Sequence, residues 1–418
     1  MRVETLALIA RGLARLGLLA TLAATSPALA QEPPPAWDAR DREIAARFAP
    51  IFHQGVVGTG RFDYITNFDF DGDWIGDNNW KNAADTARPL KGYVYYAVSE
   101  TPTHYLIHYA AFHPRDYKGG EATGAVLSQA VRRGARASKR VIDAPIVDDV
   151  VLAHENDLEG CLVVVAKHGP RLEDAAVVAV ETLAHNRYLK YQPSPTVAGG
   201  IELVQLDGQH PRIYVEPKGH GMQAWADQPT AATDALPVAP PGGSASPNGG
   251  GLGGRLGSLV GGINQARRLV NNEGAERVRV YRYTGVAEDP DRTTGDVGYD
   301  LVPTFLTLWP RARAANESYA VTEDFGTRTV TVATETGTLT REVSLGLLGA
   351  SFRGLEGAAN MARPPWGWFD MNERSLPPGT WFFDPASVVV RHFDDLKDAS
   401  TAYLHQPFFG IVRPAPAR

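Results

Sequence analysis

The chain has 418 residues, of which 44% are hydrophobic, and its formal net charge is −6 at pH 7. This mildly acidic balance disfavours nucleic-acid binding, which needs a basic surface. The single cysteine, Cys161, excludes an intrachain disulfide, and the apolar run around it predicts a buried thiol.

The first 30 residues have the order of a secretory signal. Three arginines come first, an apolar run follows, and a small-x-small sequence ends the segment (Arg2, Arg11, Arg15; residues 16–25; Ala28, Leu29, Ala30). No apolar run in the chain reaches the roughly 20 residues that span a bilayer. We expect residues 1–30 to be removed and the protein to be secreted or periplasmic; a retained membrane anchor is the alternative. The segment carries three Arg and one Glu, a net charge of +2, and the whole chain carries −6. The mature chain would therefore carry a net charge of −8.

The rest of the chain shows one helix and then a β pattern. Residues 38–52 have apolar side chains at helical spacing, which predicts a short N-terminal helix. Strands are expected at 93–98 and 104–112, joined by a hairpin-like turn, and then at 160–166, 175–182, 201–206, 213–216, 277–283, 299–308, 328–333 and 380–383. Many short strands with few long helices predict a mainly β fold, a β-sandwich with loop insertions.

Two segments interrupt the strand pattern. Residues 124–140 carry five basic side chains and predict a solvated helix or loop, with phosphate or lipid binding as the alternative. Residues 236–257 are rich in Gly and Pro, a composition that cannot bury a core. Because strand-like segments stand on both sides of it, we predict that residues 31–418 form a single β-sandwich domain with a low-complexity loop at 236–257.

Side chains able to bind a metal ion are concentrated between His154 and Gly160, just before a predicted buried strand. Successive strand side chains point to opposite faces, so Asp157 and Glu159 share one face. His154 would reach them from a loop. One imidazole and two carboxylates predict a divalent-metal site; the alternative is a solvated acidic turn.

A histidine further along the chain is a candidate for a fourth ligand. His220 lies between Gly219 and Gly221, whose freedom lets the backbone bend and present the ring. His185 is a weaker candidate. Oxygen-rich ligation by His154, Asp157, Glu159 and His220 would suit Ca²⁺, Mg²⁺ or Mn²⁺.

An acidic run upstream is a candidate for a second ion. Asp69, Asp71 and Asp73 alternate around Gly72, as in calcium-binding loops, although Trp80 stands where an EF-hand has its Glu. The alternative is an Asx-rich turn capped by its own side chains.

Two other runs bear polar or aromatic side chains. His113, Arg115 and Asp116 end the second strand and predict either a polar site or an Arg–carboxylate pair. Residues 362–370 hold two adjacent prolines, which exclude a helix interior. They predict a rigid aromatic loop packed on the sandwich or, alternatively, a platform for carbohydrate or lipid. No nucleophile elbow, Walker loop, dinucleotide fingerprint or Cys-x-x-Cys is present, which disfavours those enzyme classes.

The order of these motifs resembles a known group of proteins. His154-Glu155-Asn156-Asp157-Leu158-Glu159-Gly160 resembles the GHRHDWE heptad of the necrosis- and ethylene-inducing cytolysins. It is closer to the H-E-x-D-x-E-G stretch of a related family of vacuolar-protein-sorting-associated and uncharacterised secreted proteins. The runs at residues 71–74, 112–117, 218–221 and 362–366 also resemble elements of that group.

The resemblance implies a β-sandwich with a surface divalent cation held by acidic side chains and histidine. By position, His154, Asp157 and Glu159 match the first His, the Asp and the Glu of the heptad, while Asn156 and Leu158 replace its second His and its Trp. In the cytolysins the metal helps to engage sphingolipid headgroups of plant membranes. The resemblance thus implies that this chain shares the fold and the metal site of the cytolysins, but not their activity.

Three functions compete on this basis. The first is a secreted, metal-binding β-sandwich that recognises a glycan, a lipid headgroup or a cell-envelope component. The second is a metal-dependent hydrolase of phosphodiester or ester bonds, with His154 or His220 as acid or base. The third is an envelope protein whose acidic loop binds calcium only for rigidity. Whether the chain is an enzyme is therefore open at this point.

Overall fold

The computed structural model describes residues 35, 37–74, 76, 78–117, 154–194, 201–225, 275–313, 322–324, 327–334, 336–344, 347–349, 364–370, 372–373, 375–377 and 379–413. The expected signal segment, the basic segment 124–140 and the loop 236–257 lie outside these residues. Residues Ala36–Arg418 form one compact unit.

The unit is built on one mixed 12-stranded sheet, in the order β10-β9-β1-β11-β12-β2-β3-β4-β5-β6-β7 with β8 beside β9. The strands are β1 (Ile51–Val56), β2 (Tyr93–Glu100), β3 (His104–Asp116), β4 (His154–Lys167), β5 (Ala175–Ala184), β6 (Arg187–Gln192), β7 (Ile201–Leu203), β8 (Leu206–Asp207), β9 (His210–Val215), β10 (Met222–Ala224), β11 (Arg277–Tyr283) and β12 (Val297–Pro303). β1 pairs antiparallel with β11, so strands on both sides of residues 226–274 share this sheet.

The sheet folds back on itself, which makes it a β-sandwich, as predicted. Side chains of β2–β5 share one buried cluster, the inner core, with side chains of β1, β9, β11 and β12. β10, at one end of the strand order, lies against β5. There the Thr182 hydroxyl donates a hydrogen bond of 2.6 Å to the Met222 carbonyl. Cys161 is buried in the inner core, as expected.

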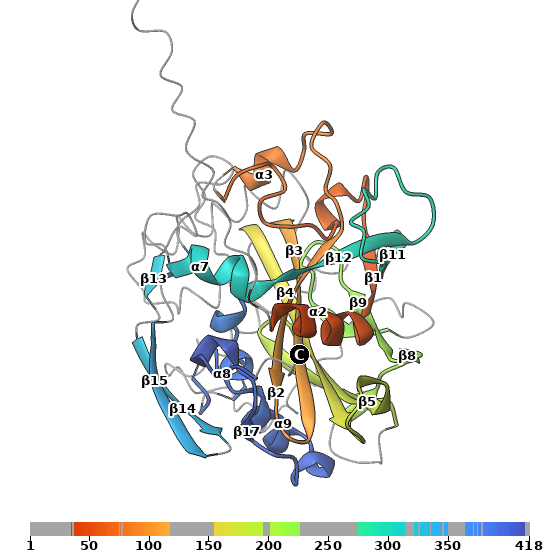
Figure 1. Ribbon diagram of the computed structural model, residues 1–418. Coiled ribbons are helices and arrows are strands. Elements are labelled where there is room, and N and C mark those ends of the chain that lie inside the picture. Colours follow the sequence, from red (N-terminus) through yellow and green to blue (C-terminus); the bar gives the residue numbers. More distant parts are fainter. Residues whose placement is uncertain are drawn as a thin grey trace, which may run out of the picture. The chain divides into compact units, whose positions relative to one another are not determined.

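A second apolar layer, the outer core, covers the opposite face of β2–β5. It is formed by C-terminal residues, above all Trp366, Trp368 and Trp381, whose side chains are at most 1% exposed. The helices α8 (Thr380–Phe383) and α9 (Pro385–His392) belong to it and lie beside the sheet (Figure 1). The aromatic loop therefore packs on the sandwich, and the alternative of an exposed platform at these tryptophans is wrong.

Shorter elements complete the unit. The remaining helices are α2 (Asp38–Arg47), α3 (Asn79–Asn82) and α7 (Leu308–Arg313). Two small sheets hold β13 (Thr322–Asp324) with β16 (Leu347–Gly349), and β15 (Gly337–Ser344) with β14 (Thr327–Thr334) and β17 (Ala402–Tyr403).

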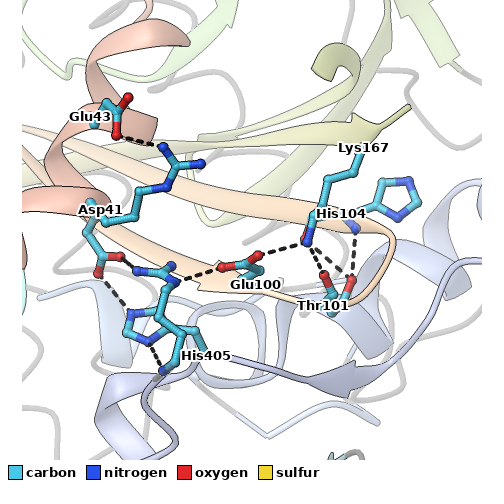
Figure 2. Close-up of polar contacts among 9 residues, drawn as sticks. Asp41, Glu43, Glu100, Thr101, His104, Lys167 and His405 are labelled. Atoms are coloured by element: carbon cyan, nitrogen blue, oxygen red, sulfur yellow. Dashed lines mark hydrogen bonds and ion pairs between the residues drawn. The ribbon is translucent and has the colours of Figure 1, made fainter. Parts of the chain in front are cut away.

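A chain of alternating charges joins α2 to the C-terminal residues. Buried Asp41 accepts hydrogen bonds from His405 Nε2 at 2.9 Å and from Arg413 Nη1 at 2.5 Å. Arg413 and Lys167 each donate to Glu100 at 2.8 Å. Figure 2 shows Asp41, Glu100, Lys167 and His405 in this arrangement. Burial would raise the pKa of Glu100, but the bonds and charges of Lys167 and Arg413 lower it.

Several predicted elements differ in type or extent. The single strand expected over 201–206 is two short strands, β7 and β8. The helix expected over 38–52 ends at Arg47, because Pro50 cannot lie in a helix interior and disfavours helix at Ala49. The strand expected over 299–308 ends at Pro303, and α7 begins at Leu308. The strand expected at 380–383 is the helix α8.

Candidate functional site

The candidate site lies on the inner face of the sheet, toward one end of β3 and β4. His113 and Asp157 are register partners on these antiparallel strands. Their strand neighbours on the same face, Ala111 and Cys161, belong to the inner core. The turn between β9 and β10 supplies His220, and the segment after β1 supplies Asp63.

His220 is held in an uncommon backbone conformation. Its φ is 51° and that of Lys218 is 68°, in the left-handed region that side chains other than glycine rarely adopt. The imidazole is fully buried. Its Nδ1 lies 2.9 Å from Asp157 Oδ2, and its Nε2 lies 3.5 Å from Asp63 Oδ1. The turn therefore places the ring between two carboxylates.

Asp63 is itself fixed by three donors. Its Oδ2 accepts from the Tyr117 hydroxyl at 2.6 Å and from the Val57 backbone N–H at 3.0 Å. Its Oδ1 accepts from the Lys218 backbone N–H at 2.8 Å. A fully buried carboxylate needs such donors, because an ionised oxygen without them would be costly to desolvate.

The two buried histidines form a parallel stack. The rings of His113 and His220 lie 3.7 Å apart at an interplanar angle of 2°. His113 Nε2 lies 3.0 Å from Gln54 Oε1. Burial, together with the charge of His220, lowers the pKa of His113 well below its usual value. Burial would also lower the pKa of His220, but Asp157 and Asp63 outweigh it and raise that pKa to about 9. At neutral pH the stack thus pairs a neutral ring with a protonated one.

Exposure increases along the cluster. Asp63 and His220 are completely buried, whereas 9% of the Asp157 side chain is exposed. Glu159, on the same strand face as Asp157, is half-buried. A ligand from solvent would therefore meet Asp157 and Glu159 before it met His220.

The predicted ligand set is brought together only in part. Asp157 and His220 are in contact, but His154 lies within β4 opposite Asp116, so its expected place in a loop was wrong. Its side chain lies outside the described set. Among the side chains that are described, no group of three or more His, Cys, Asp or Glu is arranged to hold a metal ion.

The acidic run at Asp69–Asp73 is engaged by amides. Asn67 donates to Asp69 at 2.7 Å and Asn82 donates to Asp71 at 2.6 Å. The Asp73 backbone N–H donates to Asp71 at 3.3 Å. Burial raises the pKa of Asp71. These are the contacts of an Asx-rich turn.

The segment that follows the acidic run is attached to β4 by the predicted motif itself. Asn156, with φ 58°, donates to the Gly76 carbonyl at 2.7 Å and accepts from Asn79 at 2.6 Å. Glu155 accepts from the Trp80 backbone N–H at 2.5 Å. Asn156 and Glu155 thus attach the segment around Gly76 and Trp80 to β4, which is a structural role.

The other polar candidates have structural partners. The Arg115 guanidinium stacks on the rings of Phe62, at 3.5 Å, and Trp80, at 4.7 Å, and donates to the Trp80 carbonyl at 2.7 Å. His185 Nε2 lies 3.0 Å from Glu216 Oε2.

Sequence reasoning missed Asp63, Gln54 and Tyr117. Asp63 is one of 47 acidic residues and stands in no motif. Gln54 lies in β1, and the first two residues of β1 belong to the segment 38–52 that was predicted as a helix. Tyr117 is only the last residue of the run at 112–117. No local pattern marks these residues, because their role comes from strands distant in sequence.

Fold and site together describe a mainly β protein with a buried acidic–histidine cluster at one end of its sandwich. Neither a protein-family model nor a curated protein matches the chain. Among solved structures, one described as "Toxin fold for microbial attack and plant defense" is 18% identical, with a TM-score of 0.25, over 46% of this chain and 70% of that one.

Two further structural neighbours bear related descriptions. "NLPPya in complex with mannosamine" is 20% identical over 46% of this chain and 69% of that one, with a TM-score of 0.25. "Necrosis and Ethylene inducing Protein 2 from the causal agent of cocoa's Witches Broom disease" is 16% identical over 44% of this chain and 67% of that one, with a TM-score of 0.26. At these values the likeness carries no argument about function. In the part of the chain that the structure describes, no helix is long and apolar enough to cross a membrane.

Proposed function

We propose that the protein is exported and that the end of the sandwich around Asp157 and Glu159 recognises a polyhydroxylated sugar headgroup, in a glycan or on a lipid. The observation that carries this proposal is a pair of acidic side chains on one strand face, Asp157 and Glu159, at the solvent side of a buried cluster in which His113 Nδ1 has no hydrogen-bond partner among the described residues. Buried polar groups are nearly always satisfied in folded proteins. An unsatisfied polar group next to these carboxylates fits a site whose polar partners come from a ligand.

The charges of the site favour a ligand rich in donors. Asp157 and Glu159 are carboxylates, and ionised carboxylates only accept hydrogen bonds. Sugar hydroxyls donate and accept, so one headgroup can bond to the carboxylates and to the side chains around them. This chemistry is shared by free glycans and glycolipid headgroups.

A divalent cation is the second part of the proposal. Asp157 and Glu159 would supply oxygen donors, which suit Ca²⁺, Mg²⁺ or Mn²⁺; His154, expected as the third ligand, is part of β4 three residues before Asp157, so it does not share their strand face. Two carboxylates alone do not make a metal site. When bound, the ion would supply positive charge to which sugar oxygens can bind. Membership of the vacuolar-protein-sorting-associated group, with its H-E-x-D-x-E-G stretch, belongs to the same proposal. Nothing in the described residues favours the metal-dependent hydrolase.

Binding is tested with purified mature protein on a glycan array and on vesicles that carry glycolipids. We expect binding by wild type and a loss of at least tenfold in affinity for Asp157→Asn. The matched control is Asp207→Asn, which removes an exposed carboxylate that pairs with Arg282. If wild type binds no sugar in either format, or if both variants bind equally, the proposed function is wrong.

Export is tested separately. Protein recovered outside the cytoplasm should begin near Gln31 when its N-terminus is sequenced. A start at Met1, or retention in the cytoplasm, would contradict export.

A further inference from the structure

We propose that His220 is a positioning residue that fixes the Asp157 carboxylate from behind, and that it is not itself a ligand to a cation. This inference rests on the proposed function of the Asp157 site. It replaces the expectation that His220 completes the metal ligands.

The difference in burial between His220 and Asp157 indicates which of them would contact a ligand. The His220 side chain has no exposed surface, whereas the Asp157 side chain is 9% exposed. His220 Nδ1 lies 2.9 Å from Asp157 Oδ2, so this nitrogen is occupied by the carboxylate. A ligand that enters from solvent reaches Asp157 first, and His220 lies on the far side of that carboxylate.

A rigid support lies behind His220. Its Nε2 faces Asp63 Oδ1 at 3.5 Å, and Asp63 is held by Tyr117 and by two backbone N–H groups, those of Val57 and Lys218. The support draws on the segment after β1, on Tyr117 directly after β3 and on the turn itself, so it is set by the fold and not by the turn alone.

The plane of the ring is fixed as well. His113 stacks on His220 at 3.7 Å and 2°, and Gln54 holds His113 at 3.0 Å. Rotation of the His220 ring would break this stack and both carboxylate contacts. The geometry therefore determines where one oxygen of Asp157 lies, and with it the direction in which the carboxylate faces a ligand. Residues that orient a ligating carboxylate in this way typically contribute 10–100-fold to affinity.

The first test needs no ligand. In ¹⁵N-histidine NMR spectra of the whole mature protein, the His220 Nδ1 proton should be shifted downfield and exchange slowly with water. Asp157→Ala should abolish this signal, and Glu159→Gln should leave it in place. If Asp157→Ala leaves the signal unchanged, the positioning role is refuted.

The second test measures affinity for Ca²⁺ alone by calorimetry. We expect His220→Ala to lose at least tenfold and His220→Gln, which keeps an N–H donor, to recover part of that loss. Equal affinity of His220→Ala and wild type would refute the role. If wild type binds neither Ca²⁺, Mg²⁺, Mn²⁺ nor sugar, the proposed function fails, and the NMR signal still decides whether His220 positions Asp157.

Discussion

Gly160 closes the predicted motif, and its substitution tests why glycine stands there. A Cβ added at this position would lie 2.7 Å from Trp368 Cζ3 and 2.8 Å from the Tyr109 carbonyl oxygen. Ordinary contacts between non-bonded carbon atoms are about 3.5–4.0 Å. Either the Trp368 ring or the backbone of β3 would have to move. We therefore predict that Gly160→Ala destabilises the protein although it adds only one methyl group.

The size of the effect follows from what holds the ring. Trp368 is 1% exposed, and its Nε1 donates to the Leu158 carbonyl at 3.0 Å. Overpacking a tight core costs about 1–3 kcal/mol, and loss of that hydrogen bond adds about 1 kcal/mol. We expect the free energy of unfolding to fall by about 2–4 kcal/mol.

Urea unfolding followed by tryptophan fluorescence measures this change. The control is Gly208→Asn, at a φ of 64° that asparagine tolerates and with no atom within 4 Å of an added Cβ. It should change stability by less than about 0.5 kcal/mol. In a Trp368→Leu background the cost of Gly160→Ala should shrink. A Gly160→Ala protein as stable as wild type would refute the packing argument.

Three further predictions concern buried polar contacts. Asp41→Ala should lower the free energy of unfolding by about 3–5 kcal/mol in urea titrations, because it leaves buried His405 without its carboxylate; an effect under about 1 kcal/mol would contradict this. Trp381→Phe should cost about 1–3 kcal/mol, since it removes the indole N–H that donates to fully buried Glu181 at 2.7 Å; unchanged stability would show that the bond contributes nothing. Burial lowers the pKa of His392, but Glu181 outweighs it and the net shift is upward. The stability that His392 contributes should therefore be complete below its usual pKa of 6.5 and be lost as pH rises through the higher folded value. Melting temperatures of wild type and His392→Gln should differ most near pH 6 and converge in alkali, and a gap that widens with pH would refute the sign.

Much of the fold could be read from local pattern. Strands β2, β3, β5 and β11 match the expected segments because each alternates or is continuously apolar between clear turns. The helix α8 could not be read in this way. Three consecutive aromatics are typical of a strand, but all three are 1% exposed, and a strand would turn the middle one away from the others. Contacts with the outer core decide its conformation.

The site could be predicted only for residues whose type suits metal binding and whose sequence context suggests where they lie. Asp157 and His220 were both expected, and they lie together. Their roles were not predictable, because they depend on His113, which lies in β3, and on Asp63, which lies in the segment after β1, and only the fold brings these residues together. The asparagine that replaces the heptad's second histidine holds the segment around Gly76, a contact that no spacing indicates.

The most direct test of the account is the melting temperature of mature wild-type protein in chelator and in millimolar Ca²⁺, Mg²⁺ or Mn²⁺. Without a cation, Asp157 and Glu159 would repel each other on one strand face, so a bound ion should stabilise the fold. We expect a higher melting temperature with at least one of these ions. Asp157→Ala should show no such increase, and its far-UV spectrum should remain β-rich. A wild-type melting temperature that is the same in chelator and in all three ions would contradict the metal site.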